Sequence, residues 1–382
     1  MISTKKQPIR ILHVLAGMNR GGVETWLMHV LRNIDRERFQ MDFLVATTQL
    51  CAYDEEVIAL GSKIIPCLHP SKPLMYARNF KRLYQQHGSY DIVHSHIHHY
   101  SGYILRLAKQ VGIPIRIAHS HNDTSSQEAK AGLFRRFYLG LTEYLIKQYA
   151  TLGLACSEKA ASDLYGGDWK HDSRWKVLHY GIDLSAWNDT VDKANIRAEL
   201  KIPKDAFVIG HVGRFAEQKN HSMFVEIASN IIQKEPKAHF LLVGDGRLRS
   251  DIEQKVHQAG LSNCVTFAGL RSDIPQVMKG AMDVFLFPSL HEGLPMVLIE
   301  AQAAGLPCVI SDVISEEVDA IQSLIQRIPL TKEVSYWGKN VLNKNIPLNI
   351  GQSEALGIIK NSSFNIQKSI NTLEAIYTSK VI

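Results

Sequence analysis

The chain has 382 residues, of which 45% are hydrophobic, 21% charged and 8% aromatic. These values are typical of a globular protein and exclude a chain that is mainly disordered, collagen-like or coiled coil, and the length favours two domains. The net charge of +6 arises in the first half, because residues 1–190 hold 23 Lys and Arg against 17 Asp and Glu, whereas the remainder holds 20 of each.

The first half alternates strand-like and helix-like segments. A β-branched run at 9–15 leads into a loop with two adjacent glycines, and apolar residues then recur at helical spacing from 23 to 34. Further strands are predicted at 41–45, 63–67, 91–94, 115–118, 153–156 and 175–178. This alternation predicts βαβ units that share one parallel sheet.

A polar stretch at 185–205 separates this half from a second one in which the pattern restarts. Strands are predicted at 207–212, 238–243, 265–267, 284–287 and 308–311, and helices at 222–232, 248–258 and 274–281. The pattern weakens after Asp312, and a last helix is predicted at 361–377. We therefore expect an α/β protein with two doubly wound domains, in which ligands bind at the carboxyl ends of the strands, in the cleft between the domains.

The segment from Pro288 to Ala301 carries the strongest chemical signal. A strand ends at Pro288, and Pro295 suits the first position of a helix, whose N-terminus favours anions. Glu292 and Glu300 would lie about 12 Å apart along such a helix, whereas the acid and base of a glycosidase are about 5–9.5 Å apart. The spacing therefore favours two carboxylates that hold opposite ends of one elongated polar ligand.

Two further loops could meet phosphate. Arg214 and Lys219 follow a strand and precede a helix, where they could neutralise a diphosphate leaving group. Gly21 and Gly22 follow the first strand and would let the backbone approach a ligand closely at the start of the next helix.

Histidines gather after two neighbouring strands of the first half. Continued strand alternation would place His94, His96 and His98 on one face, while His119 and His121 follow the next strand. A zinc site is conceivable, but the chain has no H-E-x-x-H motif and carboxylates are sparse nearby. We expect no metal.

Taken together, these segments resemble the retaining GT-B glycosyltransferases of family GT4, most closely the capsule and exopolysaccharide transferases of the EpsF type. The resemblance covers about residues 1–312 and rests on Asn19–Glu24, Arg214-x4-Lys219, Gly244-Asp245-Gly246 and Glu292-x7-Glu300. It implies the GT-B fold, with two Rossmann-like domains that face each other across a cleft. We place the first, on the acceptor side, at 1–184 and the nucleotide-sugar-binding domain at 185–362, with a helix at 363–382 packing back on the first.

The resemblance also implies roles for individual residues. Arg214 and Lys219 would bind the diphosphate, Glu300 the ribose hydroxyls and Glu292 the transferred sugar, while His119 or His121 would lie beside that sugar. Other donor contacts would come from Gly213, Asp245, Gly246, Gly293 and Leu294, and a phosphate or acceptor loop from Gly21, Gly22 and Glu24. The family's usual Asn-Gly-x-Asp is Tyr180-Gly-Ile-Asp in this chain, so the contact of that Asn is not expected.

The resulting hypothesis is a metal-independent transferase that moves a sugar, with retention, from a UDP-sugar to a polyprenyl-linked or other saccharide acceptor. No signal peptide or membrane-spanning run is evident, so we expect a cytoplasmic protein. The basic first half, with aromatic and basic residues mixed at 134–138, suits contact with an anionic membrane face rather than with nucleic acid. Two alternatives stay open, namely a non-catalytic sugar-nucleotide-binding protein and a metal-dependent hydrolase built on the histidines.

Overall fold

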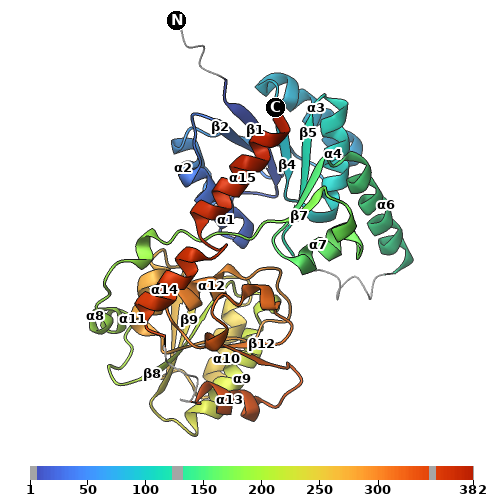
Figure 1. The fold of residues 1–382 in the computed structure, drawn as a ribbon. Coiled ribbons are helices and arrows are strands. Elements are labelled where there is room, and N and C mark those ends of the chain that lie inside the picture. The colour runs from blue at the N-terminus through green and yellow to red at the C-terminus, as the bar shows by residue number, and fades with distance from the viewer. Residues whose placement is uncertain (1–6, 123–131, 344–349, 382) are drawn as a thin grey trace, which may run out of the picture. The chain divides into compact units, whose positions relative to one another are not determined.

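The protein divides into two compact units in a computed structural model that describes residues 7–122, 132–343 and 350–381. Unit 1 comprises Met1–Gly181 together with Ile366–Ile382, and unit 2 comprises Ile182–Asn365. Each unit has its own parallel sheet with helices packed against it (Figure 1).

The sheet of unit 1 has seven strands in the order β3-β2-β1-β4-β5-β6-β7, and all neighbours run parallel. Its strands are rich in β-branched and aliphatic residues and are largely buried, as expected of a sheet covered on both faces. Their bounds are β1 (Ile9–Leu15), β2 (Phe39–Val45), β3 (Ile64–Pro66), β4 (Ile92–Ser95), β5 (Ile115–Ser120), β6 (Leu152–Ala155) and β7 (Trp175–Val177).

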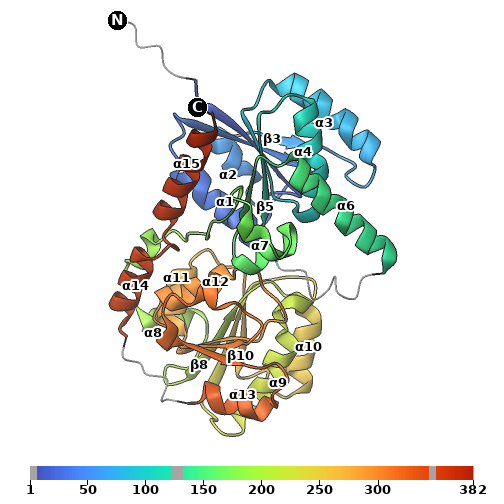
Figure 2. The same cartoon turned by 45° about the vertical axis from the view of Figure 1, so that its right-hand side comes forward.

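The C-terminal helix α15 (Ile366–Val381) belongs to unit 1, where it packs against α1 and β1, as Figures 1 and 2 both show. It therefore brings residues from the far end of the chain to the sheet of the first half. The other helices of this unit are α1 (Gly22–Asn33), α2 (Asp54–Ala59), α3 (Pro73–His87), α4 (Ser101–Gln110), α6 (Leu133–Tyr149) and α7 (Glu158–Tyr165), with short 3₁₀ turns η1 (His98–Tyr100) and η2 (Trp169–His171).

Unit 2 repeats the architecture with six parallel strands in the order β10-β9-β8-β11-β12-β13. The strands are β8 (Phe207–Val212), β9 (Ala238–Val243), β10 (Val265–Gly269), β11 (Val284–Phe287), β12 (Cys308–Ser311) and β13 (Ile325–Ile328). The helices are α8 (Lys193–Glu199), α9 (His221–Ile232), α10 (Arg249–Gln258), α11 (Ile274–Ala281), α12 (Met296–Ala303), α13 (Val334–Val341) and α14 (Gln352–Asn361). Four 3₁₀ turns lie in its loops, at η3 (Ser185–Trp187), η4 (Glu217–Lys219), η5 (Glu316–Val318) and η6 (Gln322–Leu324).

The predicted pair of doubly wound parallel sheets is confirmed, and the sequence prediction differs mainly after Asp312. The helix predicted at 361–377 is wrong at its start, because α14 ends at Asn361 and α15 begins only at Ile366. Between them residues 362–364 form a bend and a turn, and the Phe364 carbonyl accepts a hydrogen bond from the Ile182 N–H at 2.8 Å. The two paired segments lie where the chain passes from one unit to the other, at 181/182 and 365/366.

The strand β13 was not predicted at all. Its four residues Ile-Gln-Arg-Ile do not alternate apolar and polar, and the segment is too short for a periodicity argument. An ion pair between Arg327 and Asp319, with an N–O distance of 2.6 Å, fixes its connection to the preceding loop.

Within the described ranges, none of the helices has both the length and the apolar character that crossing a bilayer would require.

Candidate active site

Two loops of unit 2 cross each other at the carboxyl ends of β8 and β9. The Gly213 N–H donates to the Val243 carbonyl at 2.9 Å, and the Phe215 N–H donates to the Asp245 carbonyl at 2.9 Å. A Cβ atom at Gly244 would clash with the Gly213 carbonyl oxygen, and Gly244 has a φ of +133°. The G-x-G turn is therefore required for the backbones to approach each other.

The side chains at this crossing differ in what they contact. The Asp245 carboxylate accepts hydrogen bonds from its neighbour Gly246 at 2.6 Å and from Arg249 at 3.2 Å. The Arg214 guanidinium is exposed and has no partner among the residues that the structure describes. A free guanidinium beside a glycine-rich crossing is available to bind an anion.

Lys219 and Glu292 form an ion pair with each other, although they are predicted to bind different parts of the donor. Lys219 Nζ lies 2.7 Å from Glu292 Oε1, and Gln218 Nε2 donates to Glu292 Oε2 at 3.2 Å. The Lys219 side chain is 17% exposed and that of Glu292 7%. Lys219 also lies over the ring of Phe287, 4.7 Å from its centroid. The pair is thus held in a fixed, partly buried position before any ligand binds.

Further hydrogen bonds join the loop after β8 to the loop after β11. The Leu290 N–H donates to the Gln218 carbonyl at 2.8 Å, and the Asn220 side chain donates to the Pro288 carbonyl at 3.1 Å. Asn220 has a φ of +53°, the left-handed conformation that Asn tolerates better than most residues. Gln218 and Asn220 were missed in the sequence, although both lie within the motif that contains Lys219.

The helix α12 begins one residue later than predicted. Pro295 is its N-cap rather than its first helical residue, with a ψ of 98°. The N–H groups of Gly293 and Leu294 donate to no other described residue. Both residues are buried. Their N–H groups lie just before the amino end of α12, a position that favours the oxygen atoms of a ligand.

Glu300, on α12, is half-buried, and its carboxylate has no hydrogen-bond partner within the described part of the chain. Burial raises the pKa of this carboxyl to about 7. Its charge therefore changes near neutral pH, and only the ionised form presents both oxygens as acceptors to two hydroxyls of a ligand.

This shifted pKa predicts a pH dependence of donor binding. If Glu300 holds ribose hydroxyls, the KM for the donor should fall about five- to tenfold between about pH 6 and about pH 8, because the carboxylate forms over that range. Glu300→Gln should raise the KM at high pH and flatten the profile, while Glu226→Gln, at an exposed position on α9, should leave the profile unchanged. A profile in Glu300→Gln that matches the wild type would contradict this role.

In unit 1, the loop of Gly21 and Gly22 leads into α1, which begins at Gly22 with Gly21 as its N-cap. The Glu24 carboxylate folds back over this end, since a Cβ atom at Gly21 would clash with Glu24 Oε2. Glu24 therefore occupies the helix N-terminus at which a phosphate was expected.

The histidines of the first half lie in the core of unit 1. His119 and His121 are both buried, and burial lowers their pKa values, to about 3 for His121, so both are neutral. His98 is not on the face of His94 and His96 as predicted, because β4 ends at Ser95 and His98 adopts a φ of +37°. It pairs instead with Asp163, with an N–O distance of 3.0 Å.

Among the described residues there are three groups of side chains that could hold a metal ion. Within each group, the possible ligand atoms lie within 4.8 Å of one another. The groups are His13, His94 and His96; His96, His119 and His121; and His98, His99 and Asp163. Most ring nitrogens of the first two groups form hydrogen bonds with each other or with tyrosine hydroxyls. These hydrogen bonds explain why the histidines lie together.

Two side chains near these histidines were missed in the sequence. Tyr180, at the position where the family has Asn, bonds His121 and stacks on Trp26, with the ring centroids 4.6 Å apart. Tyr377, on α15, bonds His94 at 2.8 Å. Only the tertiary structure brings residues 377 and 94 together.

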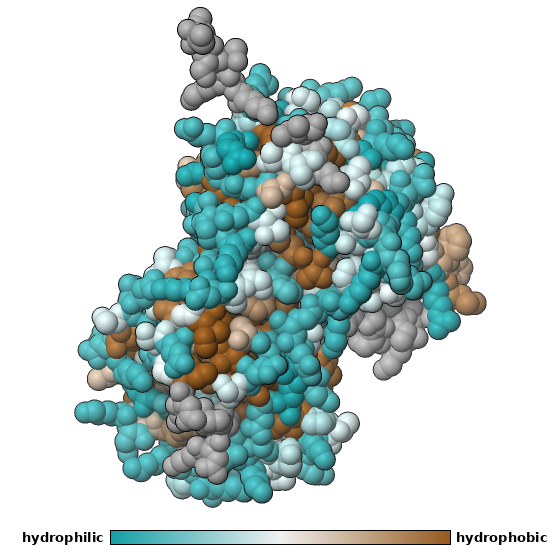
Figure 3. All heavy atoms as spheres, viewed as in Figure 1, coloured by the Kyte–Doolittle hydropathy of each residue, from teal (hydrophilic) through white to brown (hydrophobic). Residues whose placement is uncertain are grey.

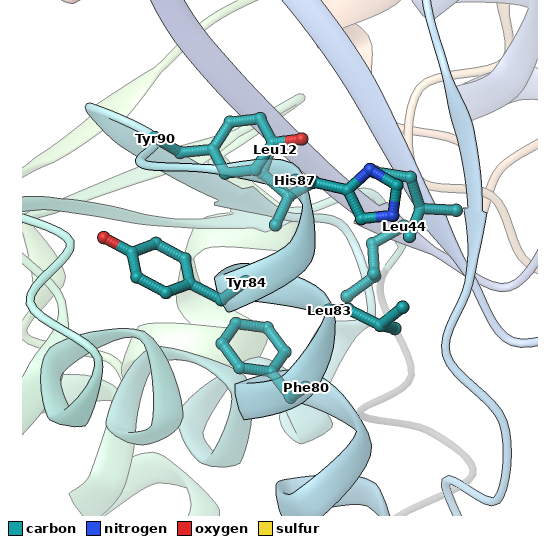
Figure 4. Close-up of a pocket in the computed structure, with 8 residues that line it drawn as sticks. Leu12, Leu44, Phe80, Leu83, Tyr84, His87 and Tyr90 are labelled. Atoms are coloured by element: carbon teal, nitrogen blue, oxygen red, sulfur yellow. The ribbon is translucent and has the colours of Figure 1, made fainter.

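A small cavity in unit 1 contains none of the candidate residues (Figure 4). Its walls are mostly apolar and are formed by Leu12, Leu44, Ile65, Phe80, Leu83, Tyr84, His87 and Tyr90.

Known proteins are similar to this chain in both sequence and fold. Residues 20–186 match the family model described as Glycosyltransferase Family 4, and residues 206–327 match the one described as Glycosyl transferases group 1. A protein of Bacillus subtilis named "Putative glycosyltransferase EpsF" is 38% identical over 87% of this chain and 86% of its own length. The chain therefore belongs to glycosyltransferase family 4 and is a glycosyltransferase with the GT-B fold.

The name of a more distant relative states its substrates, and a solved structure with a similar fold contains ligands. The UDP-Gal:alpha-D-GlcNAc-diphosphoundecaprenol alpha-1,3-galactosyltransferase of Escherichia coli is 28% identical over 77% of this chain and 76% of its length. The crystal structure of Anabaena Alr3699/HepE in complex with UDP and glucose matches 97% of this chain and 100% of that chain, with a TM-score of 0.79 and 19% identity.

Proposed function

We propose that the protein transfers a sugar, with retention of configuration, from a UDP-sugar to a hydroxyl of a lipid-linked saccharide in exopolysaccharide or capsule assembly. The observation that carries the proposal is the set of groups around the crossing loops of unit 2. Among the described residues, the Arg214 guanidinium and the N–H groups of Gly293 and Leu294 have no partner. Together with the half-buried Glu300, they are groups that a nucleotide diphosphate needs. The names of the E. coli relative and of the HepE complex support a UDP-linked donor.

In this mechanism the diphosphate becomes the leaving group, and its developing charge is neutralised by Arg214 and Lys219. Preorganised cations of this kind commonly supply the largest electrostatic contribution to catalysis. Glu292 holds Lys219 in place and, on the family resemblance, meets the transferred sugar. The acceptor oxygen attacks the anomeric carbon from the face that the leaving diphosphate vacates, and the hydroxyl proton passes to the departing phosphate oxygen. We therefore assign no protein nucleophile, and since Arg214 and Lys219 neutralise the diphosphate we assign no metal.

The experiment uses the full-length protein, a panel of nucleotide sugars and an undecaprenyl-diphosphate-linked saccharide, with and without EDTA. NMR of the product should show that the anomeric configuration of the donor is retained, and EDTA should leave the rate unchanged. An inverted product would overturn the mechanism. Donor binding without turnover would favour a binding protein, and release of free sugar without transfer would favour a hydrolase.

The acceptor would reach the protein at the cytoplasmic face of a membrane, and α6 is the surface that suits this contact. Only Thr142 and Ile146 of α6 are buried, while Phe134 is 94% exposed and Phe137 74%. The side chains of Arg135 and Arg136 lie between them and are also exposed. Figure 3 shows the apolar surface at the end of α6. Aromatic and basic side chains on one helix favour an anionic lipid interface.

Replacing Phe134 and Phe137 by serine should weaken binding to vesicles that contain phosphatidylglycerol by about tenfold or more, because two large apolar side chains no longer enter the interface. Sedimentation with vesicles measures this change. Ile58→Ser is the matched control, because Ile58 is 61% exposed but lies on the acidic helix α2. Equal binding of the double variant and the wild type would contradict the role of α6.

A further inference from the structure

Seven buried side chains of unit 1 form two hydrogen-bonded chains that the mechanism above does not use. In the first chain, His94 Nδ1 lies 2.8 Å from the Tyr377 hydroxyl and His94 Nε2 lies 3.0 Å from His119 Nδ1. The second chain consists of Tyr180, His121, His96 and His13. Each chain therefore has a tyrosine at one end. At its other end is a histidine nitrogen with no partner among the described residues, His119 Nε2 in the first chain and His13 Nε2 in the second.

The tyrosine sets the direction of the first chain. The Tyr377 hydroxyl is buried and has no other partner among the described side chains. If it accepted a hydrogen bond from His94, two buried groups would have no partner among the described residues, the Tyr377 hydrogen and the lone pair of His119 Nε2. The opposite direction leaves only one, the hydrogen on His119 Nε2, and is favoured because each unsatisfied buried group costs stability. Tyr377 therefore donates to His94 Nδ1, and because a neutral imidazole carries one N–H, His94 donates from Nε2 to His119 Nδ1.

The rule that a neutral imidazole carries one N–H then determines the tautomer of His119. Its Nδ1 is an acceptor, so its single hydrogen must lie on Nε2, the atom that has no partner. His119 is fully buried, and burial together with the neighbouring histidines keeps its pKa well below the usual value. At Nε2, His119 is thus a neutral hydrogen-bond donor rather than an acceptor or a base.

We propose that Tyr377 and His94 are positioning residues that hold His119 as its Nε2–H tautomer, so that His119 donates a hydrogen bond to a hydroxyl or ring oxygen of the sugar. This last step rests on the proposed function, whereas the tautomer itself does not. Tyr377 lies on α15, so the C-terminal helix supplies a group that orients a side chain of the first half. A bound metal is the competing explanation, because His96, His119 and His121 could share one ion.

The experiment is a nitrogen-15 NMR spectrum of the full-length protein with labelled histidine, which distinguishes protonated from unprotonated ring nitrogens. The His119 signals are identified by their loss in His119→Gln. In the wild type, Nε2 of His119 should be protonated and Nδ1 should not. In Tyr377→Phe, His94 loses its donor and His119 should populate both tautomers, while Tyr90→Phe, which removes a buried hydroxyl bonded to Asp42, should change neither.

Activity provides the second readout. Tyr377→Phe should lower kcat by about five- to tenfold, the value of roughly one hydrogen bond, with the KM for the donor nearly unchanged. In the double variant with His119→Gln, the loss should not exceed that of His119→Gln alone, because both changes remove the same interaction.

The outcomes separate the two proposals. A protonated Nδ1 on His119 in the wild type, or the same tautomer in Tyr377→Phe as in the wild type, would overturn the relay even if transfer is observed. A stoichiometric metal in elemental analysis that is lost in His119→Gln would also overturn it. The expected tautomer in a protein that transfers no sugar would support the relay and overturn the proposed function. If Tyr377→Phe does not fold, the wild-type spectrum alone decides the tautomer.

Discussion

Replacing Lys219 by alanine is expected to lower kcat for sugar transfer by about 10²–10³-fold, the effect of removing one preorganised charge that stabilises a leaving group. Lys219 Nζ is held 2.7 Å from Glu292 Oε1 and over the Phe287 ring, so its position costs no reorganisation during the reaction. The measurement is the rate of UDP release with saturating acceptor.

Two controls separate catalysis from stability. Truncating Lys219 also leaves the Glu292 carboxylate without its cation at a site where it is only 7% exposed, which costs up to about 3 kcal/mol of stability. The double variant with Glu292→Gln should recover most of that stability but not the rate. Lys237→Ala breaks an ion pair with Asp205 in which both side chains are more than two-thirds exposed, and it should change neither quantity. A wild-type kcat in Lys219→Ala would remove Lys219 from the mechanism.

Gly244→Ala is expected to destabilise unit 2 by about 3 kcal/mol or more, because it combines a backbone clash with a strained conformation. The added methyl group would meet the Gly213 carbonyl oxygen, which is backbone and cannot rotate away. The loop that carries Arg214 would have to move, so UDP binding should weaken together with stability.

The matched control is Gly260→Ala. Gly260 also has a positive φ, of +69°, but a Cβ atom there would meet nothing within 4 Å. This substitution should therefore cost only the conformational strain, about 1 kcal/mol. Calorimetry of both variants, with UDP titration, measures the difference. Equal transition temperatures for the two variants would mean that the loop crossing does not limit the stability of unit 2.

Much of the site could be predicted from sequence because its motifs are local. Arg214, Lys219, Glu292 and Glu300 each follow a strand of unit 2, and parallel strands bring their carboxyl ends to one edge of a sheet. What the spacing could not predict is which of these groups contact each other. The ion pair between Lys219 and Glu292 joins two loops more than 70 residues apart, and Arg214 pairs with none of the described residues.

The last helix shows why periodicity alone fails at some boundaries. Residues from Asn361 to Tyr377 have apolar positions at helical spacing, yet the helix is interrupted by a turn at Phe364, whose carbonyl accepts a hydrogen bond from Ile182. A hydrogen bond to a segment more than 180 residues away outweighs a local helical preference that is worth only tenths of a kcal/mol per residue.

By itself, the sequence determined that two parallel sheets form and that phosphate- and sugar-binding motifs follow their strands, because hydrophobic periodicity and glycine positions act over a few residues. The tertiary structure decided the state of the histidines. Whether His119 Nε2 donates or accepts depends on a hydroxyl from Tyr377, because the favoured direction of the hydrogen-bonded chain leaves the fewest buried groups without a partner among the described residues.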